Sequence, residues 1–104
     1  MKLKLFRISG DSMSPQFVES DYVLVFSRRN LKLKRGQIVV VNHPFYGTIV
    51  KRIARVTRGN TLRLRGDNRQ ESTSTEALGE ITQDQVIGKV VWHIPGKRQP
   101  ASRA

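Results

Sequence analysis

The sequence predicts a small all-β domain, and two observations carry this prediction. Apolar residues alternate with polar ones or form short runs between turn residues, while the spacing of an amphipathic helix is nearly absent. The chain has 104 residues, of which 38% are hydrophobic, and this suffices for one domain with a small core. We expect about six strands in coiled or mixed β-sheets, with only a turn or so of helix.

Turn residues mark the ends of the expected strands. The first apolar segment, residues 3–8, ends in a turn over residues 9–15, where Gly10 permits a positive φ. Residues 22–26 form an uninterrupted apolar run, which we expect to be a strand buried on both faces. Further strands are expected at residues 37–42, 47–57, 61–65 and 85–93, with a hairpin turn at 58–60 and a polar loop from 66 to about 75.

Composition limits the domain organisation and the classes of partner. Residues 1–95 are expected to form the domain, and residues 96–104 a flexible basic tail. The formal net charge of +11 favours acidic partners, nucleic acid or anionic membrane surfaces. No run approaches the roughly 18 apolar residues of a membrane span, and no secretory leader is recognisable. We therefore expect a soluble, cytoplasmic protein without a transmembrane anchor.

The residues that usually bind metals give little reason to expect a metal site. The chain has no cysteine, which excludes disulfides, thiolate metal sites and a cysteine nucleophile. His43 and His93 are fifty positions apart, and we expect a loop residue and a strand-end residue, respectively. Asp11 and Asp67 border glycine turns, where we expect them to cap or hydrogen-bond the backbone, and Asp21 is expected as a turn residue that enters a strand. No metal and no cofactor are expected.

Lys51 occupies an unusual position in the expected strand 47–57. Because side chains alternate across a strand, Lys51 shares a face with Ile49 and Ile53, the more apolar face of this strand. Burial disfavours an ammonium and lowers its pKa, and a neutral lysine can act as a general base. The alternative is a lysine near a strand end whose stem packs while its head group reaches water.

Ser12 is the candidate nucleophile, because a chain without cysteine must use a hydroxyl. It follows the Gly10 turn and precedes Ser14 and Pro15. Such turns can present a side chain clear of the backbone, with N–H groups free to bind an oxyanion. The alternative is a serine that only caps or hydrogen-bonds the turn.

Short motifs follow one another in a specific order between residues 8 and 91. They are GDSMSP at 10–15, ESDYVLV at 19–25, KRGQIVV at 34–40, GTIVKRI at 47–53, GDN at 66–68, Ser72, LG at 78–79 and IGKV at 87–90. In this order they resemble the signal peptidase I family of Ser/Lys proteases. The resemblance implies a β-rich fold of the signal peptidase catalytic-domain type, in which Ser12 attacks a peptide carbonyl and neutral Lys51 takes its proton.

The same resemblance implies further site residues. The backbone N–H of Ser12 would donate to the oxyanion, and it would act alone because Gly10 stands where some members carry a hydroxyl donor. Ser72 matches a serine that orients the lysine, whereas Ser74 and Glu76 replace an Asp–Arg pair of many members. The substrate would bind as an extended strand, with small side chains before the scissile bond. The residues expected to bind it are Ile8, Ser9, Gly10, Met13 and Ile49.

The small size and the missing anchor narrow the resemblance to soluble maturation proteases of nickel-type superoxide dismutase. These enzymes remove a short leader so that the new N-terminus can bind nickel. The expected partner is therefore a protein substrate with an N-terminal leader, with the nickel superoxide dismutase precursor as the candidate.

Two other functions are weighed against this one. LexA/UmuD-like self-cleaving domains share the Ser/Lys mechanism, but they need an upstream cleavage segment, and only eleven residues precede Ser12. A basic β-barrel that binds nucleic acid would need exposed aromatic residues and clustered cations. The aromatic residues sit mostly in or beside apolar runs and are expected in the core, and the cations are spread along the chain, so nucleic acid is not an expected partner. These aromatic residues are Phe6, Phe17, Tyr22, Phe26, Phe45, Tyr46 and Trp92.

Overall fold

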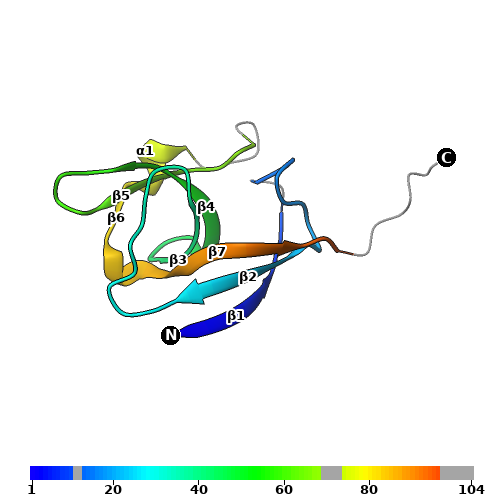
Figure 1. Ribbon diagram of the computed structural model, residues 1–104. Coiled ribbons are helices and arrows are strands. Elements are labelled where there is room, and N and C mark those ends of the chain that lie inside the picture. Colours follow the sequence, from blue (N-terminus) through cyan, green and yellow to red (C-terminus); the bar gives the residue numbers. More distant parts are fainter. Residues whose placement is uncertain (11–12, 69–73, 97–104) are drawn as a thin grey trace.

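The computed structural model describes residues 1–10, 13–68 and 74–96, and in this part the chain is all-β (Figure 1). One seven-stranded sheet has the order β1-β2-β7-β3-β4-β5-β6, and the pairings between its strands are antiparallel. The predicted all-β fold is thus confirmed. The elements are β1 (Lys2–Arg7), β2 (Tyr22–Ser27), β3 (Ile38–His43), β4 (Gly47–Val56), β5 (Leu62–Arg65), α1 (Thr75–Leu78), β6 (Glu80–Ile81), the 3-10 turn η1 (Gln83–Gln85) and β7 (Val86–Ile94).

The strand that the sequence did not indicate is β6. It has only two residues, which are too few to produce a visible alternation of apolar and polar side chains. The predicted hairpin between β4 and β5 is present, and the Thr57 N–H donates to the Thr61 carbonyl across it at 2.9 Å. No helix in the described segments is long and apolar enough to cross a membrane. Of the tail predicted for residues 96–104, only Gly96 lies within the described residues.

The sheet is curled (Figure 1), and β3 has a hydrophobic core on each of its two faces. Along β3, Ile38 and Val40 belong to one cluster, while Val39 and Val41 belong to the other. The first core cluster comprises Ile8, Met13, Phe17, Val23, Val25, Ile38 and Val40. The second core cluster comprises Val39, Val41, Ile53, Leu62, Leu64, Leu78 and Ile81.

The expectation that residues 22–26 form a strand buried on both faces is wrong. In β2, Val23 and Val25 are buried in the first core cluster, but Leu24 is only half-buried and Tyr22 is exposed. The reason is that β1, β2 and the second half of β7 pack against the core with one face only. An apolar run therefore does not distinguish a strand in the middle of the curled sheet from one near its edge.

The aromatic residues expected in the core are also divided between core and surface. Phe17 is buried, and Phe6 and Phe26 are half-buried. Proximity to an apolar run does not indicate burial, because neighbouring side chains in a strand point to opposite faces and turn residues point outward. The exposed aromatic residues are Tyr22, Phe45, Tyr46 and Trp92.

Gly88 allows β7 to pack closely against β2. A Cβ atom on Gly88 would lie 2.6 Å from the Phe26 carbonyl oxygen and 2.6 Å from Val25 Cγ1. We expect Gly88→Ala to lower the free energy of unfolding by about 1–3 kcal/mol, measured by chemical denaturation, because the two strands must move apart. The control is Gly59→Ala in the β4–β5 hairpin, where the nearest atom is 3.9 Å away. The control should change stability by less than about 0.5 kcal/mol, and equal losses in both variants would contradict this role of Gly88.

Candidate active site

Strand β4 places Lys51 in the interior of the protein. Lys51 pairs with Val39 of β3, and only 4% of its surface is exposed. Its side chain shares a face of β4 with Ile49 and Ile53, both of which pack in or against the second core cluster. The predicted burial of Lys51 is confirmed, and the alternative of a lysine whose head group reaches water is wrong.

This burial changes the proton equilibrium of Lys51. Apolar surroundings disfavour the charged ammonium, so the pKa of Lys51 falls below its ordinary value of 10.5. Within the described segments, the ion pairs involve other cations, and none brings a carboxylate to Lys51. Since nothing there opposes the effect of burial, Lys51 is neutral over a wider pH range than a surface lysine. A neutral amine can accept a proton.

A cavity of about 260 Å³ opens beside Lys51. One side consists of Phe6 and Arg7 of β1 with the residues that follow, and the other side is the first half of β4. The residues expected to bind substrate all line this cavity together with Lys51: Ile8, Ser9, Gly10, Met13 and Ile49. The structure therefore brings together residues from two distant segments of the sequence.

Four further residues line the cavity and were not predicted. They are Phe6, Arg7, Thr48 and Val50. The alternation in β4 assigns Thr48 and Val50 to the face opposite Lys51, so sequence reasoning offered no signal for including them. They reach the cavity because it lies at the edge of β4, where both faces of a strand are accessible.

Ser12 lies outside the described residues, as do Asp11 and Ser72, so their predicted roles stay predictions. The described residues on either side of Ser12 are Gly10 and Met13, and both line the cavity. Gly10 has a φ of +79°, the left-handed conformation that the turn was expected to need. The backbone on both sides of Ser12 thus borders the space that Lys51 lines.

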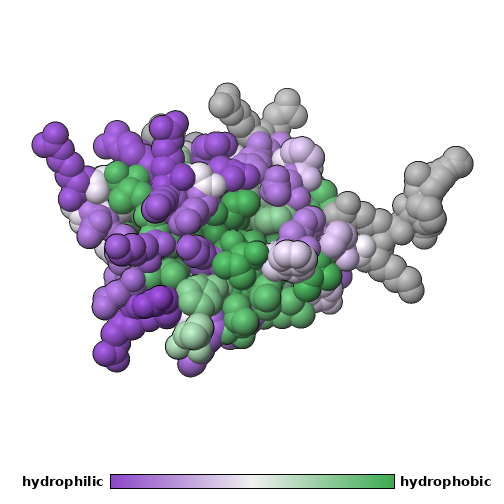
Figure 2. Space-filling model, viewed as in Figure 1, coloured by the Kyte–Doolittle hydropathy of each residue, from purple (hydrophilic) through white to green (hydrophobic). Residues whose placement is uncertain are grey.

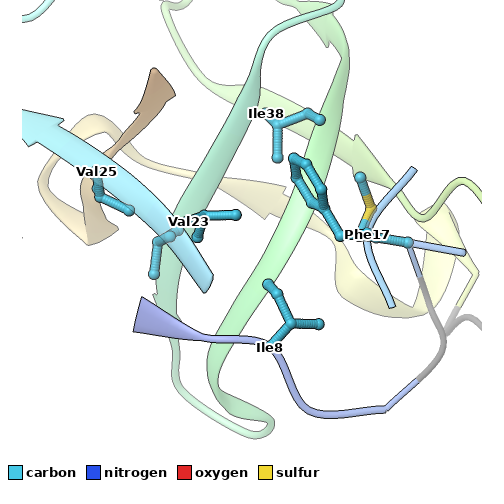
Figure 3. Packing of buried hydrophobic residues seen from close by; sticks show 7 residues of the cluster. Ile8, Phe17, Val23, Val25 and Ile38 are labelled. Atoms are coloured by element: carbon cyan, nitrogen blue, oxygen red, sulfur yellow. The ribbon is translucent and has the colours of Figure 1, made fainter. Parts of the chain in front are cut away.

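Packing fixes the segment that leads to and from Ser12. Ile8, Met13 and Phe17 have at most 5% of their surface exposed and belong to the first core cluster. Figure 3 shows the Phe17 ring beside Ile38, with Ile8 below it. The Phe17 N–H also donates to the Met13 carbonyl at 2.9 Å. The turn is therefore held at both ends by buried apolar side chains.

Asp21 joins the end of this turn to the last strand. Its side chain is fully buried, and it accepts hydrogen bonds from the backbone N–H groups of Val18 at 3.1 Å and Gly96 at 2.9 Å. His93 Nε2 lies 2.8 Å from Asp21 Oδ2, and the His93 ring also contacts Phe17, with 4.8 Å between the ring centroids. His93 is near the end of β7, as predicted. Asp21 was expected only as a turn residue, but its buried side chain connects the bend before β2 to the end of β7.

The first half of β4 has an edge that is suited to an extended peptide. In the described part of the chain, β5 pairs with β4 only from Arg52 onward. The Ile53 N–H donates to Gln37 on the β3 side, so the alternation of the ladder directs the N–H and C=O groups of Thr48 and Val50 to the other side. This edge borders the cavity, where a bound strand could pair with it.

Asp67 binds a side chain, which corrects the expectation that it hydrogen-bonds the backbone. Arg52 Nε donates to Asp67 Oδ1 at 2.8 Å and Arg52 Nη2 donates to Asp67 Oδ2 at 2.7 Å. These bonds lower the pKa of Asp67 and raise that of Arg52. Arg52 Nη1 also donates to the Gly36 carbonyl at 2.7 Å. The Arg52–Asp67 pair holds the GDN segment against β4, directly after Lys51. Ser74 stands where many members of the signal peptidase I family carry one residue of an Asp–Arg pair. Here it caps α1 by accepting a hydrogen bond from the Ala77 N–H.

His43 is not a loop residue, as had been expected, but the buried last residue of β3. Its Nδ1 accepts from the backbone N–H groups of Phe45 and Tyr46, so Nε2 carries the proton that it donates to the Leu78 carbonyl at 2.9 Å. His43 thereby holds the β3–β4 turn and α1 together. Within the described residues, no group of three His, Asp or Glu side chains could hold a metal ion.

Residues 1–91 match the model of the Peptidase S24-like family. The chain belongs to this family. The match supports a Ser/Lys peptidase, and it spans both the turn that contains Ser12 and the strand that contains Lys51. No curated protein matches the chain. Membership in the S24-like family supports Ser/Lys peptidase chemistry in general. It does not show that the chain belongs to the narrower group of nickel superoxide dismutase maturation proteases.

Lys51→Met tests the energetic effect of the buried amine in this S24-like protein. At neutral pH we expect the variant to unfold at a higher denaturant concentration than the wild type, because it buries no ammonium. As the pH rises toward 10.5, the folded wild type loses the Lys51 proton before the unfolded chain does, so its stability rises. The gap between the two proteins should therefore shrink with rising pH. A gap that stays constant would show that Lys51 is not desolvated.

Asp67→Asn tests the ion pair with Arg52. We expect the free energy of unfolding to fall by about 1–3 kcal/mol at neutral pH, because a charged hydrogen-bonded pair is lost. The folded-state pKa of Asp67 lies below 3.8, so the pair contributes above this value and its contribution disappears as the pH falls through the folded-state pKa. Urea denaturation at several pH values measures this. Asp84→Asn, an exposed residue of η1, is the control and should have little effect.

Proposed function

We propose that the protein is a Ser/Lys endopeptidase that removes an N-terminal leader from a protein substrate. Ser12 is the nucleophile and Lys51 is the general base. The observation that carries the proposal is the burial of Lys51, with its lowered pKa, beside a cavity that is bordered by the residues on both sides of Ser12. Membership in the S24-like family supports the same chemistry.

The reaction follows from these two groups. Neutral Lys51 Nζ takes the hydroxyl proton while Ser12 Oγ forms a bond to the carbonyl carbon of the substrate. The Ser12 N–H stabilises the oxyanion, and Ser72 orients the lysine. The ammonium then gives its proton to the leaving amine as the C–N bond breaks. Water, activated by the neutral Lys51, hydrolyses the acyl ester and restores Ser12.

The substrate binds as an extended strand along the open edge of β4. The backbone groups of Thr48 and Val50 are directed to this edge, and Ile8 to Gly10 face it across the cavity. Main-chain pairing on both sides supplies affinity without demanding a particular sequence. The apolar lining from Phe6, Ile8 and Met13 favours an apolar side chain before the scissile bond, and the motif resemblance favours a small one.

The substrate that we propose is the precursor of nickel-type superoxide dismutase, processed in the cytoplasm. The choice of this substrate rests on the motif resemblance and on the net charge of the chain. A net charge of +11 attracts an acidic protein and speeds its encounter with the enzyme.

A self-cleaving domain of the LexA/UmuD type is the second candidate function. The match to the S24-like family favours it, because the same Ser/Lys chemistry serves peptidases and self-cleaving domains. The two functions differ in the origin of the cleaved segment. A self-cleaving chain loses part of itself at a rate that does not depend on protein concentration, whereas a peptidase cleaves a second protein in proportion to enzyme concentration.

Cleavage of leader-bearing proteins, followed by mass spectrometry, tests the proposal. The wild type should release the leader, and Ser12→Ala and Lys51→Ala should each lower the rate at least about 10³-fold, because each group is needed for the first step. Lys32→Ala removes an exposed lysine instead and should cleave like the wild type. The wild-type rate should rise with pH as Lys51 loses its proton, in a range below 10.5.

Three results would count against the proposal. Equal cleavage by the wild type and both site variants would exclude the Ser/Lys mechanism. Concentration-independent shortening of the chain itself, with every added protein left intact, would favour self-cleavage. Loss of activity in Lys32→Ala to the same extent as in Lys51→Ala would assign the effect to charge rather than to the buried amine.

A further inference from the structure

The outward face of the β4–β5 hairpin carries a group of arginines. Figure 2 shows mostly hydrophilic residues at the end of the molecule where this hairpin lies. The other face of the hairpin packs Ile53, Leu62 and Leu64 into the second core cluster. Residues 47–66 contain no Asp or Glu. We call the outward surface the arginine face, and it comprises Arg52, Arg55, Arg63 and Arg65.

A β-bulge at Ala54 brings these arginines onto one face. Ile53 lies opposite Leu64 and Arg55 lies opposite Arg63, so Ala54 is the extra residue of β4. Strict alternation would place Arg55 on the same side as Ile53, which faces the core. The bulge reverses this phase, and Arg55 is exposed. The bulge therefore separates the hairpin into an apolar face and a cationic face.

Strand pairing places the arginines directly opposite one another. Arg52 lies opposite Arg65, and Arg55 lies opposite Arg63. The Cβ atoms of directly opposite residues are about 4.5–5.5 Å apart, and like charges at such positions destabilise a sheet. The hairpin therefore bears a repulsion that a bound anion would remove.

Carboxylates of the described residues neutralise only one of these two rows. Asp67 accepts two hydrogen bonds from Arg52, and its Oδ1 lies 3.7 Å from Nη1 of Arg65. In the described segments, none of the ion pairs involves Arg55 or Arg63. The row formed by Arg55 and Arg63 therefore has cations without a matching carboxylate in this part of the chain.

The neighbouring residues leave this imbalance in place. Glu80 of β6 lies opposite Arg63, but its Oε1 accepts a hydrogen bond from Thr61 Oγ1 at 2.8 Å. Arg58, in the turn between β4 and β5, is exposed and adds a further cation at the end of the face. The arginine face is therefore a surface for an anionic partner.

The arginine face begins where the open edge of β4 ends. Arg52 follows Lys51 directly, and β5 pairs with β4 from Arg52 onward. A strand rises about 3.3 Å a residue, so Arg55 lies roughly 13 Å from Lys51 along β4. A chain that pairs with Thr48 and Val50 would thus bring residues about four positions from its scissile bond to the arginines.

We propose that the arginine face binds an acidic segment of the protein substrate, about four or more residues from the scissile bond. The identity of this partner rests on the proposed peptidase function, while the preference for carboxylates follows from the surface itself. A guanidinium can donate two parallel hydrogen bonds to one carboxylate, which an ammonium cannot. Side chains of an extended segment recur on one face every two residues, as Arg63 and Arg65 do on β5. Acidic residues at alternate positions would therefore each meet a guanidinium.

Charge, composition and position argue against other occupants. A second copy would bring the same arginines together on a molecule whose net charge is already +11. A nucleic acid strand would satisfy the charges, but its bases stack on aromatic rings, and residues 47–66 contain none. Duplex DNA needs no stacking, but the continuity of the arginine face with the open edge of β4 favours a polypeptide.

Binding of a short fluorescein-labelled peptide with glutamate at alternate positions tests the proposal by fluorescence anisotropy, at about 0.15 M salt. The parent protein is the full-length Ser12→Ala variant, so cleavage plays no part. Arg55→Gln/Arg63→Gln should weaken binding about tenfold or more, because two charge-assisted contacts are lost. The matched control, Arg28→Gln/Arg29→Gln, removes two exposed arginines after β2 and lowers the net charge equally. It should bind the peptide like the parent protein.

Charge reversal gives a result that misfolding cannot imitate. Arg55→Glu/Arg63→Glu should bind the lysine counterpart of the peptide more tightly than the parent protein does. In the active protein, Arg55→Gln/Arg63→Gln should raise KM for an acidic substrate with kcat unchanged, because these arginines contact the bound chain away from the reacting atoms.

Several results would overturn the assignment. Equal weakening by Arg28→Gln/Arg29→Gln would reduce the effect to net charge, and equal binding of the glutamine counterpart of the peptide would remove the role of the carboxylates. Tighter binding of duplex DNA than of the peptide, lost in Arg55→Gln/Arg63→Gln, would assign the face to nucleic acid. Peptide binding without cleavage of any leader-bearing protein would refute the proposed function and leave the acidic-ligand site standing. Cleavage with an unchanged KM in Arg55→Gln/Arg63→Gln would do the reverse.

Discussion

An amine enclosed by apolar side chains is the constraint on which the rest of this structure depends. Water would stabilise the charged form of Lys51, but only 4% of the surface of this residue is exposed. The fold must therefore stabilise β4 by other means. It does so by packing Ile53 into a core cluster, and by pairing residues 47–52 of β4 with β3. Burial of the Lys51 amine destabilises the fold at one position, and the packing and pairing of the central strands offset this cost.

Arg52, the residue after Lys51 in β4, has a structural role and lies on the other face of the strand. Lys51 turns to the interior without an ion pair among the described residues, whereas Arg52 turns to the other face and is fully paired. Because side chains alternate across a strand, two adjacent cations can lie on opposite faces, one of them buried and the other in an ion pair. The Arg52–Asp67 pair holds the GDN segment against β4.

The strands other than β6, the β4–β5 hairpin and the burial of Lys51 could be predicted, because each leaves a local pattern in the sequence. The phase of Lys51 relative to Ile49 and Ile53 is such a pattern, and so is the glycine that allows the positive φ at Gly10. The exposure of Tyr22 could not be predicted in this way, because it depends on where β2 stands in the sheet order. Nor could the pairing of Arg52 with Asp67, which is fifteen residues away and is decided by how the chain returns after β5.

The same limit applies to the cavity. Phe6 and Arg7 reach it because β1 and β4 approach each other in space, although they are far apart along the chain and in the order of the sheet. Curling of the sheet produces this approach, and curvature is a property of the assembled strands rather than of any one of them. The sequence therefore indicated the residues that line the site more easily than the shape of the space between them.

The buried carboxylate of Asp21 has a consequence for how this molecule opens. It holds the backbone at Val18, the ring of His93 and the backbone at Gly96 at once. Fraying of the end of β7 would remove two of these contacts from a buried carboxylate, and the bend before β2 would loosen with it. The bend before β2 and the end of β7 should thus exchange their amide hydrogens as one cooperative unit.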